Sequence, residues 1–237
     1  MAFSGRPLIG MAAAGVLALA GTSASAGETS FSGLWLQQHL DNRAHAAPSL
    51  TPAALSAQEE ARKATRVMGV QMCLPVGMPR MMMNELPFEI VESPERVGII
   101  SEQTELARTI YLNTKTHPVN DAQPTWNGNS YGWWETGKAG KTLVVDTANF
   151  NDRTAHIPGT PKGSTTTHLT EKYWLENGGK LLVVEMTFDD PKVLAKPYTI
   201  LNHYDRLPEG SQRWEYVCDT QDPGWNTALG VDPTKDK

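Results

Sequence analysis

From Phe88 onward, the sequence is a long series of short segments in which apolar and polar residues alternate. The first two, Phe88–Glu92 and Val97–Gln103, flank a "SPER" turn with proline at its second position. The others are "LARTIYLN", "SYGWWE", "KTLVVDT", "TTHLTEKYWLE", "KLLVVEMTF", "PYTILNHYDRL" and "RWEYVCD". A period of two, with glycine-bearing turns and no intervening helix, predicts about nine antiparallel strands in a meander. We therefore expect an all-β domain, either an antiparallel β-barrel or a β-sandwich.

A strand and a helix are expected ahead of this series. Residues 31–38, "FSGLWLQQ", alternate weakly and predict a first strand. In "SLTPAALSAQEEARK", Thr51 is placed to cap a helix whose first residue is Pro52. The apolar positions of this short N-terminal helix are mostly alanine, so we expect it to pack on another element. The expected organisation is residues 27–72 packing on a barrel domain of residues 73–225, followed by a flexible tail at 226–237.

Residues 1–26 have the pattern of a signal peptide. Arg6 precedes an apolar run from Leu8 to Ala20, and the segment ends in Ala24-Ser25-Ala26. An N-terminal membrane anchor is the alternative, but the apolar run is short for a spanning helix. We expect cleavage near Ala26 and a periplasmic or secreted protein without stable membrane insertion. The remaining 211 of the 237 residues are enough for one well-packed domain or two small ones.

Net charge and cysteine content narrow the expected partners and compartment. The formal charge is −5 and no basic run occurs, so neither nucleic acid nor an anionic membrane surface is an expected partner. The two cysteines, Cys73 and Cys218, predict one disulfide in an oxidising compartment, with two buried free thiols as the alternative. In the chain-entropy model such a long loop would contribute about 4–5 kcal/mol.

Two charged residues interrupt apolar rows of the predicted strands. Because successive side chains on a strand face opposite ways, Arg108 shares a face with Leu106 and Ile110, and Glu171 shares one with Leu169. A charge within an apolar row is costly unless it is paired or reached by water. The pattern therefore predicts either a buried Arg108–Glu171 ion pair or a polar pocket inside a barrel.

A set of linked motifs resembles a family of exported, largely uncharacterised bacterial proteins. The motifs span most of residues 50–218 in order: "LTPAALSAQEEARK", "CLPVGMPRMM", "PFEIVESPERVGII", "ARTIYLN", "HP", "PTWNGNSYGWWE", "TLVVDTANFND", "THLTEKYWL", "TFDDPKVLAKPYT" and "YVC". The resemblance implies a β-rich, lipocalin-like domain and brings no named activity. The family usually has a histidine where this chain has Asn129-Ser130 and a second one near Lys162, Gly163 and Ser164. Chemistry that depends on those two histidines is not expected here.

Four residues are candidates for acid–base chemistry. We expect His168 to act as a base, Arg108 as an anion stabiliser, and Asp146 or Glu171 as an orienting carboxylate. Arg80 is a further candidate for anion binding. His168 and Glu171 face opposite sides of one strand, so they do not form a dyad with each other. The structural alternatives are a hydrogen-bonded histidine, the ion pair, and turn formation by Asp146.

Aromatic and loop residues provide candidate contacts for a flat apolar ligand. Core packing and turn formation are the alternative roles. The expected substrate-binding residues are Arg80, Tyr111, Trp126, Tyr131, Trp133, Trp134 and Asn151. No cofactor and no metal are expected, because the six histidines show no ligand spacing and no nucleotide or nucleophile motif occurs.

These observations favour an exported protein that binds a small apolar or aromatic molecule in a barrel. The leading hypothesis is a cofactor-independent lyase or isomerase that uses proton transfer. The first alternative is a lipocalin-like carrier that leaves its ligand unchanged. The second is a structural or assembly factor of the cell envelope, which would hold no ligand.

Overall fold

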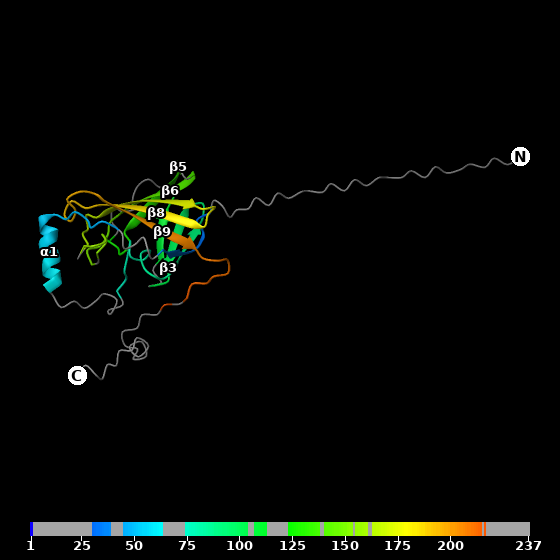
Figure 1. Ribbon diagram of the computed structural model, residues 1–237. Helices are drawn as coiled ribbons and strands as arrows, with labels where there is room; N and C mark the ends of the chain where they lie inside the picture. Colours follow the sequence, from blue (N-terminus) through cyan, green and yellow to red (C-terminus); the bar gives the residue numbers. More distant parts are fainter. Residues whose placement is uncertain are drawn as a thin grey trace, which may run out of the picture.

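The structure is a computed structural model that describes residues 1, 30–38, 45–63, 74–103, 107–112, 123–137, 140–153, 155–160, 163–214 and 216. Strands gather in one body, and the helix α1 stands beside one end of it (Figure 1). The elements are β1 (Gly33–Gln37), α1 (Pro52–Lys63), β2 (Phe88–Glu92), β3 (Arg96–Ser101), β4 (Ala107–Tyr111), β5 (Asn129–Gly137), β6 (Gly140–Ala148), β7 (His168–Glu176), β8 (Leu181–Asp189) and β9 (Tyr198–Arg206).

The strands form a closed barrel in sequence order, which confirms the barrel and excludes the sandwich. β1 closes it by pairing with both β2 and β9, for example Trp35 with Phe88 and Gln37 with Tyr204. The strictly antiparallel prediction is wrong at one place, since β4 and β5 are parallel. Alternation within a strand defines its two faces but carries no information on the direction of its neighbour.

Side chains of one parity on each strand point inward and form the core. On β7, Leu169, Glu171 and Tyr173 are buried, whereas His168 and Lys172 lie on the outer face. The largest fully buried side chains include Trp35, Tyr173, Tyr204, Phe31, Phe88, Phe150 and Phe188. Burial of this much aromatic surface is a main source of stability for the barrel.

An arginine joins the two strands that close the barrel. The Arg206 guanidinium lies over the Trp35 ring at 4.2 Å and donates hydrogen bonds to the carbonyls of Ser30, Ser32 and Gly179. Gly33 allows this approach, because a Cβ there would lie 2.8 Å from Arg206 Nη1. The contacts hold the start of β1 against the end of β9.

Helix α1 begins as predicted. Thr51 Oγ1 accepts a hydrogen bond from the backbone N–H of Ala54 at 3.2 Å, so it caps the helix, and its hydroxyl donates to the carbonyl of Lys192 at 2.9 Å. Gln58 Nε2 donates to the carbonyl of Gly159 at 2.9 Å. These bonds attach the helix to the loops that follow β6 and β8. Because β6 and β8 run in the same direction, those loops lie at one end of the barrel.

A methionine-rich segment, residues 74–83, packs into the core through Met78, Met81 and Met82, which are fully buried. Gly77 begins this turn with a φ of 65°, and a Cβ at this position would lie 2.2 Å from the carbonyl oxygen of Trp126. Glycine is therefore required at this point of the turn.

Several predicted features lie partly or wholly outside the described residues. The predicted strand at 213–219 is wrong in its described part, because Arg213, Trp214 and Tyr216 are not in a strand. Cys73, Cys218, the signal segment 1–26 (apart from Met1) and the tail 226–237 lie outside the described residues, so the disulfide remains a prediction.

Candidate functional site

The two charges that interrupt apolar rows meet inside the barrel. Arg108 of β4 and Glu171 of β7 form a two-pronged ion pair, with Nη1 donating to Oε1 at 3.0 Å and Nη2 donating to Oε2. Their side chains are 1% and 0% exposed. Of the two predicted explanations, the buried ion pair is the one that the structure contains.

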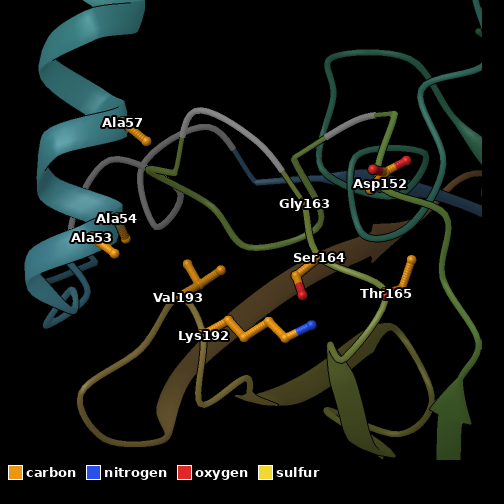
Figure 2. A pocket seen from close by; sticks show the side chains of 9 residues that line it. All are labelled: Ala53, Ala54, Ala57, Asp152, Gly163, Ser164, Thr165, Lys192 and Val193. Atoms are coloured by element: carbon orange, nitrogen blue, oxygen red, sulfur yellow. The ribbon is translucent and has the colours of Figure 1, made fainter.

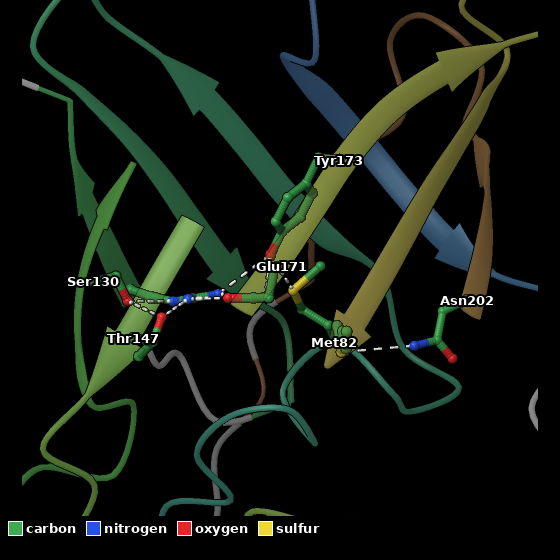
Figure 3. Close-up of polar contacts among 8 residues, drawn as sticks. Met82, Ser130, Thr147, Glu171, Tyr173 and Asn202 are labelled. Atoms are coloured by element: carbon green, nitrogen blue, oxygen red, sulfur yellow. Dashed lines mark hydrogen bonds and ion pairs between the residues drawn. The ribbon is translucent and has the colours of Figure 1, made fainter. Parts of the chain in front are cut away.

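The ion pair lies within a network that uses every donor of the guanidinium. Arg108 Nε donates to Ser130 Oγ at 3.0 Å, Nη2 to Thr147 Oγ1 at 2.7 Å, and Nη1 to the hydroxyl of Tyr173 at 3.3 Å. Figure 3 shows Ser130 and Thr147 on one side of the network and Glu171 and Tyr173 on the other. With the two bonds to Glu171, these contacts occupy all five N–H groups of Arg108. No donor remains for a bound anion.

The surroundings of the network raise the pKa values of Arg108 and Tyr173. Burial opposes the charge on Arg108, but Glu171 and then Tyr173 outweigh it and raise the pKa of the guanidinium. Burial, followed by the charge of Glu171, raises the pKa of Tyr173, whose hydroxyl donates to Glu171 Oε1 at 2.6 Å. Both shifts favour the protonated forms of Arg108 and Tyr173, so neither of these two side chains is expected to lose its proton near neutral pH.

The interior is filled along β7, β8 and β9. A set of inward side chains has no exposed surface at all: Glu171, Tyr173, Leu182, Val184, Met186, Phe188, Asn202 and Tyr204. A void large enough for water would leave part of their surface exposed, so no such space adjoins them. The expected interior binding site is therefore not found at these residues.

His168 and Asp146 meet on the outer face of the barrel. Nε2 of His168 lies 2.9 Å from Oδ2 of Asp146, and the histidine side chain is 43% exposed. The hydrogen bond to Asp146 raises the pKa of His168, and partial burial opposes the shift. Asp146 pairs in register with Tyr131, whose pKa is raised by burial and then by the charge of Asp146.

The barrel wall divides the four predicted catalytic residues. Arg108 and Glu171 lie inside, whereas His168 and Asp146 lie outside. The structure therefore does not bring the four side chains together, and their catalytic roles remain predictions. Strand parity had already separated His168 from Glu171. The register of β4, β5 and β6 separates Asp146 from Arg108.

Three predicted ligand-binding aromatics also lie on the outer face. Tyr131 and Trp133 alternate with the inward residues of β5, and Tyr111 lies beside Tyr131 on β4. The rings of Tyr131 and Trp133 stack with their centroids 5.7 Å apart, and Trp133 Nε1 donates to Glu135 at 2.6 Å. They do not line the interior, which corrects the expectation.

The remaining predicted ligand-binding residues have structural contacts. Trp134 packs against Phe31 and carries the Lys141 ammonium 3.7 Å above its ring. Trp126 is half-buried in the loop before β5, and Arg80 is exposed on the methionine-rich segment with an interaction of its own.

Asn151 forms a turn. Its Oδ1 accepts a hydrogen bond from the backbone N–H of Arg153 at 3.0 Å, and its own N–H donates to the carbonyl of Thr125 at 2.8 Å. Of the two predicted roles, turn formation is the one observed, and the turn positions the adjacent Asp152.

A pocket of about 320 Å³ lies between α1 and the loops at the end of the barrel. Figure 2 shows the alanines of α1 on one side, Asp152, Ser164 and Thr165 on the other, and Lys192 extending below them. The lining residues are Ala53, Ala54, Ala57, Asp152, Gly163, Ser164, Thr165, Lys192 and Val193. No acidic side chain occupies the first turn of α1, where the positive end of the helix dipole lies.

Asp190 holds together the two loops that line this pocket. Its carboxylate is fully buried and accepts hydrogen bonds from the hydroxyls of Thr166 at 3.0 Å and Thr167 at 2.7 Å. It also accepts the backbone N–H of Lys192 at 3.0 Å. A buried carboxylate that accepts three hydrogen bonds is compensated for its loss of water. The Asp190 carboxylate thereby links the loop before β7 to the loop after β8.

The sequence prediction missed the pocket residues and one buried histidine. His156 is fully buried, with Nδ1 3.0 Å from the carbonyl oxygen of Met78 and Nε2 2.7 Å from that of Asn151. Burial lowers the pKa of His156. The polar run at 163–167 between two strands was the only signal for the pocket, because no spacing rule links it to α1 or to Lys192.

A metal site and a membrane-spanning helix are both absent from the described residues. They contain no group of three or more His, Cys, Asp or Glu side chains placed to hold a metal ion. Across the same ranges, no helix has the length and apolar character needed to span a membrane.

The fold places the chain in a structural class. A closed nine-stranded barrel with one short helix, in the part of the chain that the structure describes, is a lipocalin-like all-β barrel, a fold compatible with ligand binding. Neither a family model nor a curated protein sequence matches the chain.

Proposed function

We propose that this protein is a carrier that binds a small, largely apolar molecule in the pocket at the end of its barrel. The supporting observation is the pocket itself, with three alanines and Val193 on its apolar side and a few polar groups opposite. Sites for small molecules in proteins combine an apolar wall with a small number of placed polar groups, in volumes of about 300–1,000 Å³. The volume of about 320 Å³ falls at the lower end of this range.

Binding without chemistry is favoured over the lyase or isomerase hypothesis. The N–H groups of Arg108 all donate to neighbouring side chains. The Glu171 carboxylate accepts hydrogen bonds from Arg108 and Tyr173, so both charged groups are already occupied by protein partners. The described residues that line the pocket include no histidine or cysteine. Lys192 and Asp152 are the only ionisable groups among those lining residues, and charged groups of this kind are sufficient for recognition.

An acid–base enzyme is the second candidate, and one observation favours it. Asp146 holds Nε2 of His168, while Nδ1 has no partner among the described residues and the ring is partly exposed. A histidine oriented through one nitrogen and open at the other has the arrangement of a general base. In this case the substrate would bind on the outer face, beside Tyr131.

We also propose that the protein acts in the periplasm or outside the cell. The support is the sequence pattern of residues 1–26, which resembles a signal peptide.

A retention experiment tests the carrier proposal. Purified protein is incubated with a mixed panel of aromatic, terpenoid and fatty compounds, and free and bound fractions are compared by liquid chromatography–mass spectrometry. Two variants accompany the native chain. Ala57→Trp places a large side chain in the pocket, and Leu55→Trp adds the same side chain to the other side of α1, where Leu55 is 53% exposed.

We expect an unchanged compound in the bound fraction of the native protein and of Leu55→Trp, and its loss from Ala57→Trp. Equal retention by all three proteins would contradict the proposed pocket. A product of new mass or new retention time that disappears in His168→Gln would replace the carrier proposal with the enzyme.

A further inference from the structure

The pocket contains one charged side chain, Lys192, that has no partner among the described residues. The Lys192 ammonium has no hydrogen bond or ion pair among the described residues. The hydroxyl of Thr165, on the side of the pocket across from α1, also has no partner among the described residues. Asp152 differs, because this residue already has an interaction.

The backbone of Lys192 is held in place on both sides. Its N–H donates to Asp190 Oδ1 at 3.0 Å, and its carbonyl accepts the hydroxyl of Thr51 at 2.9 Å. The side chain therefore projects from a fixed point toward Ser164 and Thr165 (Figure 2). A cation on an anchored backbone loses less freedom when it binds a partner than one on a free loop.

The apolar side of the pocket indicates the chemical character of the rest of an anionic ligand. The side chains of Ala53, Ala54, Ala57 and Val193 present methyl groups and no hydrogen-bonding group. Their small size leaves room beside the helix for a compact apolar body rather than a polar one.

We propose that the ligand is a carboxylate with a compact apolar body, bound through its carboxylate to Lys192 and Thr165. This inference rests on the proposed carrier function and assigns its ligand class. The apolar body lies against the alanines of α1. A monoanion is favoured over a phosphate dianion, because Lys192 is the one cationic side chain among the described residues that line the pocket.

Isothermal titration with three matched probes tests the assignment. The probes are 2-naphthoate, its neutral isostere 2-naphthamide, and 2-naphthyl phosphate, all at low ionic strength, where an exposed charge is least screened. The variants are Lys192→Met, which removes the charge and keeps the length, and Lys192→Arg, which keeps the charge. Lys196→Met is the control, since Lys196 is an exposed lysine that does not line the pocket.

We expect native protein to bind 2-naphthoate roughly tenfold more tightly than 2-naphthamide, the ratio that a partly exposed charge-assisted hydrogen bond provides. Lys192→Met should abolish this preference without weakening the amide. Lys192→Arg should keep most of the preference, and Lys196→Met all of it.

The outcomes separate the inference from the function on which it rests. Equal affinity for acid and amide, or an unchanged preference in Lys192→Met, would overturn the carboxylate assignment and leave the carrier proposal standing. Tighter binding of the phosphate than of the carboxylate would overturn the choice of a monoanion. If none of the three probes binds the native protein, the carrier proposal itself fails.

Discussion

Replacing Arg108 with methionine is expected to lower the free energy of unfolding by about 3–5 kcal/mol, the cost of leaving a buried charge without its partner. The magnitude follows from what the substitution leaves behind. Glu171, with a side chain 0% exposed, keeps only the hydrogen bond from the Tyr173 hydroxyl at 2.6 Å. Ser130 and Thr147 contribute less to this cost, because their hydroxyls remain hydrogen-bonded to each other at 3.0 Å after Arg108 is removed.

A second substitution, Glu171→Met, is expected to cost a similar amount alone and to restore stability when combined with Arg108→Met. Replacing a buried ion pair with apolar side chains is often neutral or stabilising. The remaining loss comes from the Tyr173 hydroxyl, whose other acceptor is the Met82 sulfur at 3.6 Å, and amounts to about 1–3 kcal/mol. The double variant should therefore be more stable than either single one, with a coupling energy of about 3 kcal/mol or more.

Urea denaturation followed by tryptophan fluorescence measures these values, and the chain has seven tryptophans as probes. The matched control is the exposed pair Lys172–Glu185, which joins β7 to β8 on the outer face with 3.6 Å between Nζ and Oε1. Methionine at either or both of these positions should change stability by less than about 1 kcal/mol. Additive losses in the Arg108 and Glu171 variants would refute the account of a mutually dependent buried pair.

Three further predictions concern the pH dependence, one turn and one helix cap. Because the folded pKa of His168 is raised, its pair with Asp146 stabilises the fold below about pH 6.5, and this contribution is lost as the pH rises through the folded pKa. An NMR titration should show a lower His168 pKa in Asp146→Asn, and an unchanged value would contradict the pair. Gly77→Ala should cost about 2–4 kcal/mol in urea denaturation, since a Cβ at φ 65° meets the Trp126 carbonyl, and a loss below about 1 kcal/mol would argue against that contact. Thr51→Ala should cost about 1 kcal/mol while Thr51→Ser keeps the cap, and equal stability of the two variants would exclude it.

Local patterns predicted the elements and the faces of the strands. The alternation in "THLTEKYWL" placed Glu171 inward and His168 outward, as the structure has them. The Thr51-Pro52 pair marked the start of α1. These features depend on neighbours within a few residues, which is why single-sequence patterns contain them.

The candidate site was less predictable. The aromatic residues Tyr111, Tyr131 and Trp133 were expected to line a chamber, but their parity places them on the outer face. The pocket residues were not predicted, because Ala57, Thr165 and Lys192 come from three segments more than twenty residues apart that meet only when the barrel end forms.

Short amphipathic strands that follow a capped helix can be predicted from the local sequence pattern, as can the need of Arg108 and Glu171 for a partner or for water. Only the folded structure shows that these two side chains pair with each other, that β4 and β5 run parallel, and that a pocket lies beside α1. The physical reason is that periodicity reports the environment of each side chain along one strand. Which strands become neighbours, and how fully their side chains fill the enclosed volume, depends on packing among residues far apart in the chain.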